Sequence, residues 1–120
     1  MAPQLIAAPT RIPVPGGKVI DEYVGRVTSA DSAVSVAHMR APAGGSEPAQ
    51  TPDFDEVTLV LAGSVVVEHD GGRLEVPAGQ AVITRSGERV RYLVGAEGAE
   101  YVAICLPAFD PDLAHRDPDA

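Results

Sequence analysis

Tryptophan, a second cysteine and any cluster of histidines are missing from this sequence of 120 residues. The single Cys105 cannot form a disulfide within the chain, so nothing in the sequence requires an oxidising compartment. No apolar run approaches the ~18 residues of a membrane-spanning helix, and the first residues lack the pattern of a signal peptide. The sequence therefore predicts a cytoplasmic protein.

Basic residues are also scarce. The chain has 17 acidic residues against nine basic ones, which gives a net charge of −8, and no basic block occurs anywhere. An acidic chain repels the phosphate backbone of nucleic acids and the surface of anionic membranes. The charge therefore predicts no nucleic-acid partner and no membrane partner, and leaves a small-molecule ligand or substrate.

Glycine and proline are frequent, and they divide the sequence into short segments. Twelve glycines and 11 prolines leave little room for a helix of ~10 residues. Eight runs rich in β-branched residues are predicted as strands: residues 19–27, 33–40, 57–61, 64–68, 73–76, 81–84, 89–94 and 101–106. Asp70-Gly71 predicts a hairpin turn, and residues 111–116 predict one short helical turn. This is the pattern of an all-β sandwich or barrel, in one domain over residues 1–120 with an N-terminal arm (1–15) and a C-terminal tail (108–120).

Two blocks of the sequence resemble the motifs of the cupin superfamily. Residues 54–63, FDEVTLVLAG, reproduce the second half of the first cupin motif, with Glu56 and Gly63 at the family's separation. Residues 76–80, VPAGQ, are similar to the turn that opens the second motif. The resemblance implies a jelly-roll β-barrel of two antiparallel sheets. It also implies a homodimer, in which the N-terminal arm adds a strand to the neighbouring subunit.

The metal ligands of that family are replaced. At the two spacings that the family uses, its histidine pair falls on Gln50 and Pro52, or on Ala49 and Thr51, and the last histidine position is Val90. Of the four ligands only Glu56 remains. Transition metals prefer imidazole and thiolate ligands, so we expect no metal and no cofactor. The sequence is most similar to the cupins of ethanolamine utilisation and to small stand-alone bacterial cupins. An atypical metal site made of Gln50, Glu56 and His38 remains an alternative.

Alternation along the strands predicts a ligand site inside the barrel. If Glu56 points inward, Thr58 and Val60 point inward too, and Val90 and Tyr92 share the inner face of a facing strand. We predict Glu56, His38 and Tyr92 as catalytic residues. The predicted substrate-binding residues are Gln50, Thr58, Val60, Val90 and Arg40. The structural alternative is that Glu56 is a buried anchor paired with an arginine such as Arg40 or Arg91.

A carboxylate among valines acquires a raised pKa, which suits acid–base catalysis. The favoured interpretation is an enzyme of biosynthesis, an isomerase, cyclase or lyase, that acts on a small organic molecule without redox chemistry. One alternative is a non-catalytic cupin that binds a small ligand or assists a pathway. A second is a metal-dependent oxygenase with an atypical site.

Overall fold

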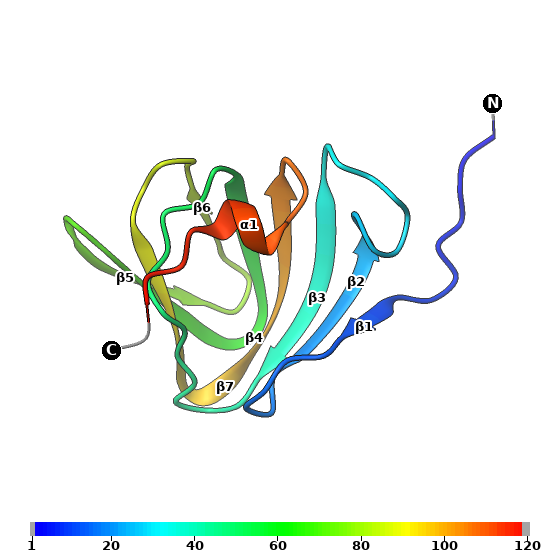
Figure 1. Ribbon diagram of the computed structural model, residues 1–120. Coiled ribbons are helices and arrows are strands. Elements are labelled where there is room, and N and C mark those ends of the chain that lie inside the picture. Colours follow the sequence, from blue (N-terminus) through cyan, green and yellow to red (C-terminus); the bar gives the residue numbers. More distant parts are fainter. Residues whose placement is uncertain (1, 119–120) are drawn as a thin grey trace.

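Figure 1 shows the computed structural model of the protein, which describes residues 2–118. It has seven strands: β1 (Thr10–Ile12), β2 (Val19–Val24), β3 (Ser35–Ala41), β4 (Asp55–His69), β5 (Gly72–Pro77), β6 (Ala81–Thr84) and β7 (Val90–Leu106). The one helix of the described residues, α1 (Pro111–Ala114), is four residues long. The predicted all-β class is confirmed. Met1 of the predicted arm and residues 119–120 of the predicted tail lie outside the described residues.

All pairings between the strands are antiparallel, and the order is β1-β2-β3-β7-β4-β5, with β6 pairing with β4. The first half of β4 lies between β6 and the end of β7, and its second half lies between β5 and the start of β7. The two long strands therefore continue from one side of the barrel to the other and join the two predicted sheets.

The bend in β4 depends on Gly63, the glycine of the first cupin-like motif. Its φ is +70°, in the left-handed region, and a Cβ at this position would lie 1.9 Å from the carbonyl oxygen of Gly98. The pairing of β4 with β7 shifts register on both sides of this glycine. The residues 57–61 and 64–68, predicted as two strands, are consequently one bent strand. The runs 89–94 and 101–106 are likewise one strand, β7.

Valine dominates the larger of two buried apolar clusters. Its buried members are Val60, Val65, Val67, Val76, Val82, Val90, Ala99 and Tyr101. A smaller cluster joins Phe54 and Cys105 to Ala114 of α1, with Phe109 and Leu113 packed against it. In Figure 1, α1 lies near β6 and the end of β7. The space between the two clusters holds the cavity described below.

The predicted hairpin at Asp70-Gly71 is confirmed, since His69 pairs with Gly72 across it. The predicted helical turn is confirmed as α1. The N-terminal arm behaves differently from the expectation, because residues 10–12 form β1 and pair with β2 of their own chain. The preceding residues extend away from the barrel (Figure 1). The homodimer stays a prediction. In residues 2–118, no helix has the length and apolarity needed to cross a bilayer.

Candidate functional site

A cavity of about 280 Å³ lies between the inner faces of β2, β3, β4 and β7. Most of its lining is apolar, and the polar and charged members are Lys18, Glu22, Ser35, Glu47, Gln50, Glu56, Thr58, Tyr92, Tyr101 and Arg116. A mostly apolar cavity with a few polar groups is the usual form of a ligand site. The cavity is therefore the candidate functional site.

Glu56 is one of the residues that line this cavity. It occupies β4 between Thr84 of β6 and Cys105 of β7, and it points inward together with Thr58. Burial raises the pKa of Glu56 from 4.5 to about 7, and the negative charge of Glu47 adds to the rise; Lys18, the Tyr92 hydroxyl and Arg116 oppose it. A carboxyl group with this pKa can both accept and donate a proton near neutral pH.

Two threonines beside Glu56 differ in their hydrogen bonding. The Thr84 hydroxyl lies 2.9 Å from the Tyr92 hydroxyl and forms a hydrogen bond with it. Thr58 is 1% exposed, and its Oγ1 has no hydrogen-bond partner among residues 2–118. A buried hydroxyl without a partner is costly, so Thr58 carries an unsatisfied polar group beside the cavity.

Lys18 is the single lysine of the chain, and it forms an ion pair with Glu47 at the side of the cavity. Its Nζ lies 6.0 Å from the centre of the Tyr101 ring. Burial acts to lower the pKa of Lys18, but the nearby Tyr101 and Glu47 outweigh it and the pKa is raised. Lys18 is therefore positively charged at neutral pH. Burial also raises the pKa values of Tyr92 and Tyr101, which keeps both hydroxyls protonated.

The C-terminal segment closes one side of the cavity. Backbone hydrogen bonds join residues 113–117 to residues 49–53, and Gln50 pairs with both Val90 and Arg116. Side-chain contacts reinforce this closure, since His115 lies 2.6 Å from Asp53 and Arg89 contacts Asp117. Arg116 and Gln50 thereby reach the cavity from different parts of the chain.

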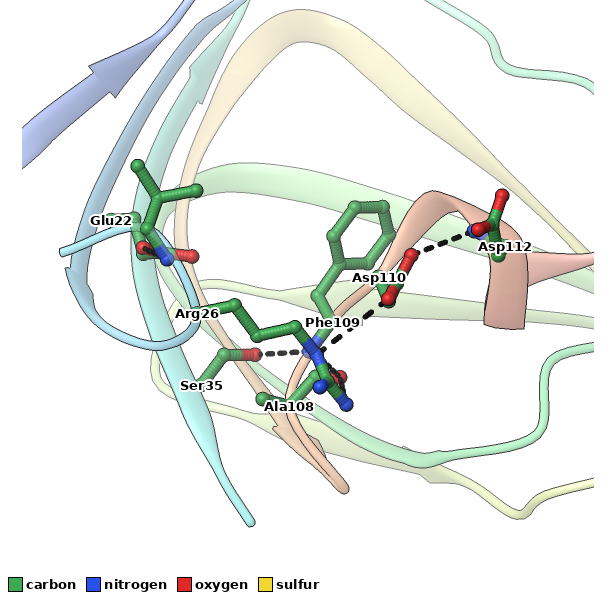
Figure 2. A network of polar contacts seen from close by, with 8 residues as sticks. Glu22, Arg26, Ser35, Ala108, Phe109, Asp110 and Asp112 are labelled. Carbon is green, nitrogen blue, oxygen red and sulfur yellow. Dashed lines mark hydrogen bonds and ion pairs between the residues drawn. The ribbon is translucent and has the colours of Figure 1, made fainter. Parts of the chain in front are cut away.

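Figure 2 shows how the segment before α1 is fixed. Arg26 donates to the carbonyl oxygen of Ala108 and lies 3.8 Å from the Asp110 carboxylate. The Phe109 amide donates to the Ser35 hydroxyl, and Asp110 accepts from the Asp112 amide at the start of α1. These contacts hold the Phe109 ring against the cavity, where it also packs edge-on against Phe54.

The structure brings four of the predicted site residues together in the cavity: Gln50, Glu56, Thr58 and Tyr92. Val60 and Val90 are buried in the valine core and do not line the cavity. His38 and Arg40 lie on the outer face of β3, where His38 contacts Glu100 at 2.7 Å and Arg40 contacts it at 3.6 Å.

The prediction that His38 assists Glu56, and that Arg40 binds the ligand, is therefore wrong. Ser35, Ala37 and Met39 take the inward positions of β3, and alternation places His38 and Arg40 outside. For the same reason the alternative ion pair of Glu56 with Arg40 does not form, and Arg91 instead contacts Glu68. The alternative metal site with His38 also fails.

Sequence analysis missed Lys18, Glu47 and Arg116. The long proline- and glycine-rich connection before β4 contains Glu47 and Gln50, and its length was a usable signal. Lys18 and Arg116 come from distant segments, and only the folded chain brings them to this cavity.

The resemblance to cupins raises the question of a metal. No three His, Cys, Asp or Glu side chains gather into a set that could hold one within the described part of the chain. The cavity around Glu56 contains the carboxylates Glu22 and Glu47 and the Cys105 thiol but no histidine, and burial raises the pKa of Cys105 and so disfavours the thiolate that a metal would need. The residues present do not fit the metal that such barrels hold elsewhere.

Solved structures decide the fold. Oxalate decarboxylase from Bacillus subtilis matches 92% of this chain and 30% of its own at a TM-score of 0.77 and 18% identity. An ethanolamine utilization protein from Salmonella typhimurium matches 77% of this chain and 71% of its own, at a TM-score of 0.65 and 18% identity. The Streptomyces protein PAC13, solved with uridine, matches 98% of this chain and 90% of its own, at a TM-score of 0.75 and 14% identity. The protein has the cupin fold. The predicted resemblance is confirmed, although no protein-family model matches the chain.

A relative in sequence points to a different function from the predicted one. Endoribonuclease YbeY of Myxococcus xanthus is 45% identical over 107 residues, which are 88% of this chain and 36% of that protein. The chain therefore spans about a third of the relative's length.

This relative contradicts the predicted small-molecule function, in its favoured form and in its alternatives, and with it the isomerase, cyclase, lyase and biosynthesis assignments. It also contradicts the prediction that no nucleic acid is a partner. That prediction used the net charge of −8, which is an average over the whole surface. It says nothing about a cavity that holds Lys18 and Arg116.

Proposed function

We propose that this protein takes part in the endoribonucleolytic processing of RNA, and that its barrel cavity binds a nucleoside of the RNA strand. The observation that carries the proposal is the 45% identity to endoribonuclease YbeY over 88% of this chain. Because the chain spans only about a third of that relative, RNA cleavage by the whole relative does not transfer directly. Binding of the RNA is the role that the present cavity supports best. The cytoplasmic location expected from the sequence is part of this proposal.

The cavity suits an unstacked nucleoside. Proteins that read single-stranded RNA stack its bases on aromatic rings and bind the base edges and the ribose hydroxyls by hydrogen bonds. Tyr92 and Tyr101 supply aromatic rings, and Gln50 and Thr58 supply amide and hydroxyl groups. PAC13, which shares the fold at 14% identity, was solved with uridine, and this supports a nucleoside as the kind of ligand.

Fluorescence anisotropy with a labelled single-stranded RNA tests the proposal. We expect saturable binding to RNA, competition by free uridine, and weaker binding to DNA of the same sequence because DNA lacks the 2′-hydroxyl. Gln50→Ala should weaken RNA binding about tenfold, as expected for the loss of hydrogen bonds in a buried site. Gln80→Ala is the matched control, since the Gln80 side chain is exposed and lies outside the cavity. Absence of RNA binding, or equal loss in both variants, would contradict the proposal.

RNA cleavage by this chain itself is a second candidate, favoured by the raised pKa of Glu56. In that reaction the Glu56 carboxylate accepts the proton of a ribose 2′-hydroxyl, and the 2′-oxygen bonds to the adjacent phosphorus. The bond from phosphorus to the 5′-oxygen breaks, and the leaving oxygen takes a proton from Tyr92, which is protonated at neutral pH. The products are a 2′,3′-cyclic phosphate and a 5′-hydroxyl end.

A denaturing gel of end-labelled RNA distinguishes this candidate from binding alone. Cleavage by the wild-type protein should fall about 100-fold in Glu56→Gln, the usual contribution of a positioned acid or base. Equal cleavage by the two proteins would indicate a contaminating nuclease and would exclude Glu56 as the base.

A further inference from the structure

A second cavity of about 260 Å³ adjoins the first. The two cavities share five polar or aromatic lining residues, namely Lys18, Glu47, Tyr92, Tyr101 and Arg116. Glu56 and Thr58 line the first cavity alone, whereas Val65 and Leu93 line the second alone. The site therefore has two chambers of similar size, of which the first contains the Glu56 carboxyl group and the Thr58 hydroxyl group and the second does not.

The residues shared by the two chambers include both basic side chains of the site. Lys18 and Arg116 carry two positive charges and Glu47 one negative charge, so the wall shared by the two chambers has a net charge of about +1. A phosphodiester carries one negative charge and would neutralise this wall. Single-stranded RNA consists of nucleosides joined by one phosphodiester each, and two adjoining chambers with a cationic wall between them match two such nucleosides. Tyr92 and Tyr101, at the same wall, offer a ring to the base in either chamber.

We infer that the two chambers bind two consecutive nucleotides of one RNA strand, and that Lys18 and Arg116 bind the phosphodiester between them. This inference rests on the proposed function and narrows it, because the protein would recognise two consecutive nucleotides together instead of a single nucleoside. In the protein without ligand, Lys18 forms an ion pair with Glu47. The bound phosphodiester competes with the Glu47 carboxylate for Lys18, so Glu47 limits the affinity for RNA.

Isothermal titration calorimetry with three ligands tests the inference. The ligands are uridine, the dinucleotide UpU, and UpU with a neutral methylphosphonate linkage, which has the same two nucleosides without the charge. UpU should bind at least about tenfold more tightly than both other ligands, because a hydrogen bond to a charged group contributes at least that factor. Lys18→Met should abolish the preference of UpU over its neutral analogue. Glu47→Gln should increase that preference.

Arg116→Met should likewise abolish the preference of UpU over its neutral analogue. Because Arg116 is exposed, this variant tests the inference even if Lys18→Met does not fold. Arg40→Met, on the outer face of β3, is the matched control and should leave all three affinities unchanged. If UpU and its neutral analogue bind equally, or if Glu47→Gln weakens UpU, the inference is wrong although the proposed function stands. If neither uridine, UpU nor RNA binds, the proposed function itself fails.

Discussion

Replacing Thr58 with valine should stabilise the free protein and weaken its ligand binding. The Thr58 hydroxyl is buried at 1% exposure and has no hydrogen-bond partner in residues 2–118. Leaving such a group unsatisfied costs about 1–3 kcal/mol, and valine removes the hydroxyl while keeping the shape of the side chain. We therefore expect Thr58→Val to raise the free energy of unfolding by about 1–2 kcal/mol.

Thr84 provides a matched control on the neighbouring strand. It is buried like Thr58, at 5% exposure, but its hydroxyl is bonded to the Tyr92 hydroxyl at 2.9 Å. Thr84→Val removes this hydrogen bond and leaves the Tyr92 hydroxyl without its partner. The expected effect is a loss of about 1–3 kcal/mol, opposite in sign to that of Thr58→Val.

Thermal unfolding followed by circular dichroism measures both effects, and a change of 1 kcal/mol corresponds to about 4 °C in Tm for a chain of this size. Calorimetry with UpU then measures binding, where Thr58→Val should lose about tenfold in affinity if its hydroxyl binds the ligand. A destabilised Thr58→Val would refute the reasoning, because it would mean that the hydroxyl is already satisfied in the free protein. A stabilised variant with unchanged affinity would remove Thr58 from the binding site.

The fold could be predicted because its determinants are local. Short β-branched runs between glycines and prolines define strands without knowledge of the tertiary structure. The sequence did not show that residues 57–61 and 64–68 are one strand, because a glycine usually signals a break. Gly63 instead bends β4 without ending it. Glycine is needed there because φ is positive and because a Cβ would meet the carbonyl oxygen of Gly98, which the local sequence does not show.

The site could be predicted where it depends on one strand and its alternation. Glu56, Thr58 and Val60 point inward as expected, because the cupin-like motif fixes the face of β4. No motif fixes the face of β3, and a shift of one residue exchanges its inner and outer side chains. His38 was therefore assigned to the wrong side.

The net charge was a poor basis for excluding a nucleic-acid partner, because net charge does not describe a cavity. Lys18 and Arg116 line the cavity together with the acidic residues Glu22, Glu47 and Glu56, although the two basic residues lie almost 100 positions apart in the sequence. Lys18 and Arg116 reach the same cavity because the C-terminal segment pairs with the loop around Gln50, and no local sequence pattern predicts that pairing.

Three further predictions concern Gly63, Cys105 and Glu56. Gly63→Ala should lower the free energy of unfolding, measured in urea, by at least about 2 kcal/mol more than Gly87→Ala does. Both glycines have a positive φ, but only a Cβ at position 63 would meet a backbone oxygen. Equal losses in the two variants would contradict this prediction. Cys105 should not react with a thiol reagent in the native protein, because burial raises the pKa of its thiol. If the native protein reacted as fast as the urea-unfolded protein, this prediction would be wrong. Glu56 has a folded-state pKa of about 7 against 4.5 when unperturbed, so the native state binds more protons than the unfolded state between these values. The wild-type free energy of unfolding should therefore fall as the pH rises through this range. Glu56→Gln cannot ionise, so it should gain about 3 kcal/mol relative to the wild type between about pH 4 and pH 8. Urea titrations at both pH values measure this difference, and a constant difference would show that the pKa of Glu56 is the same in the native and the unfolded protein.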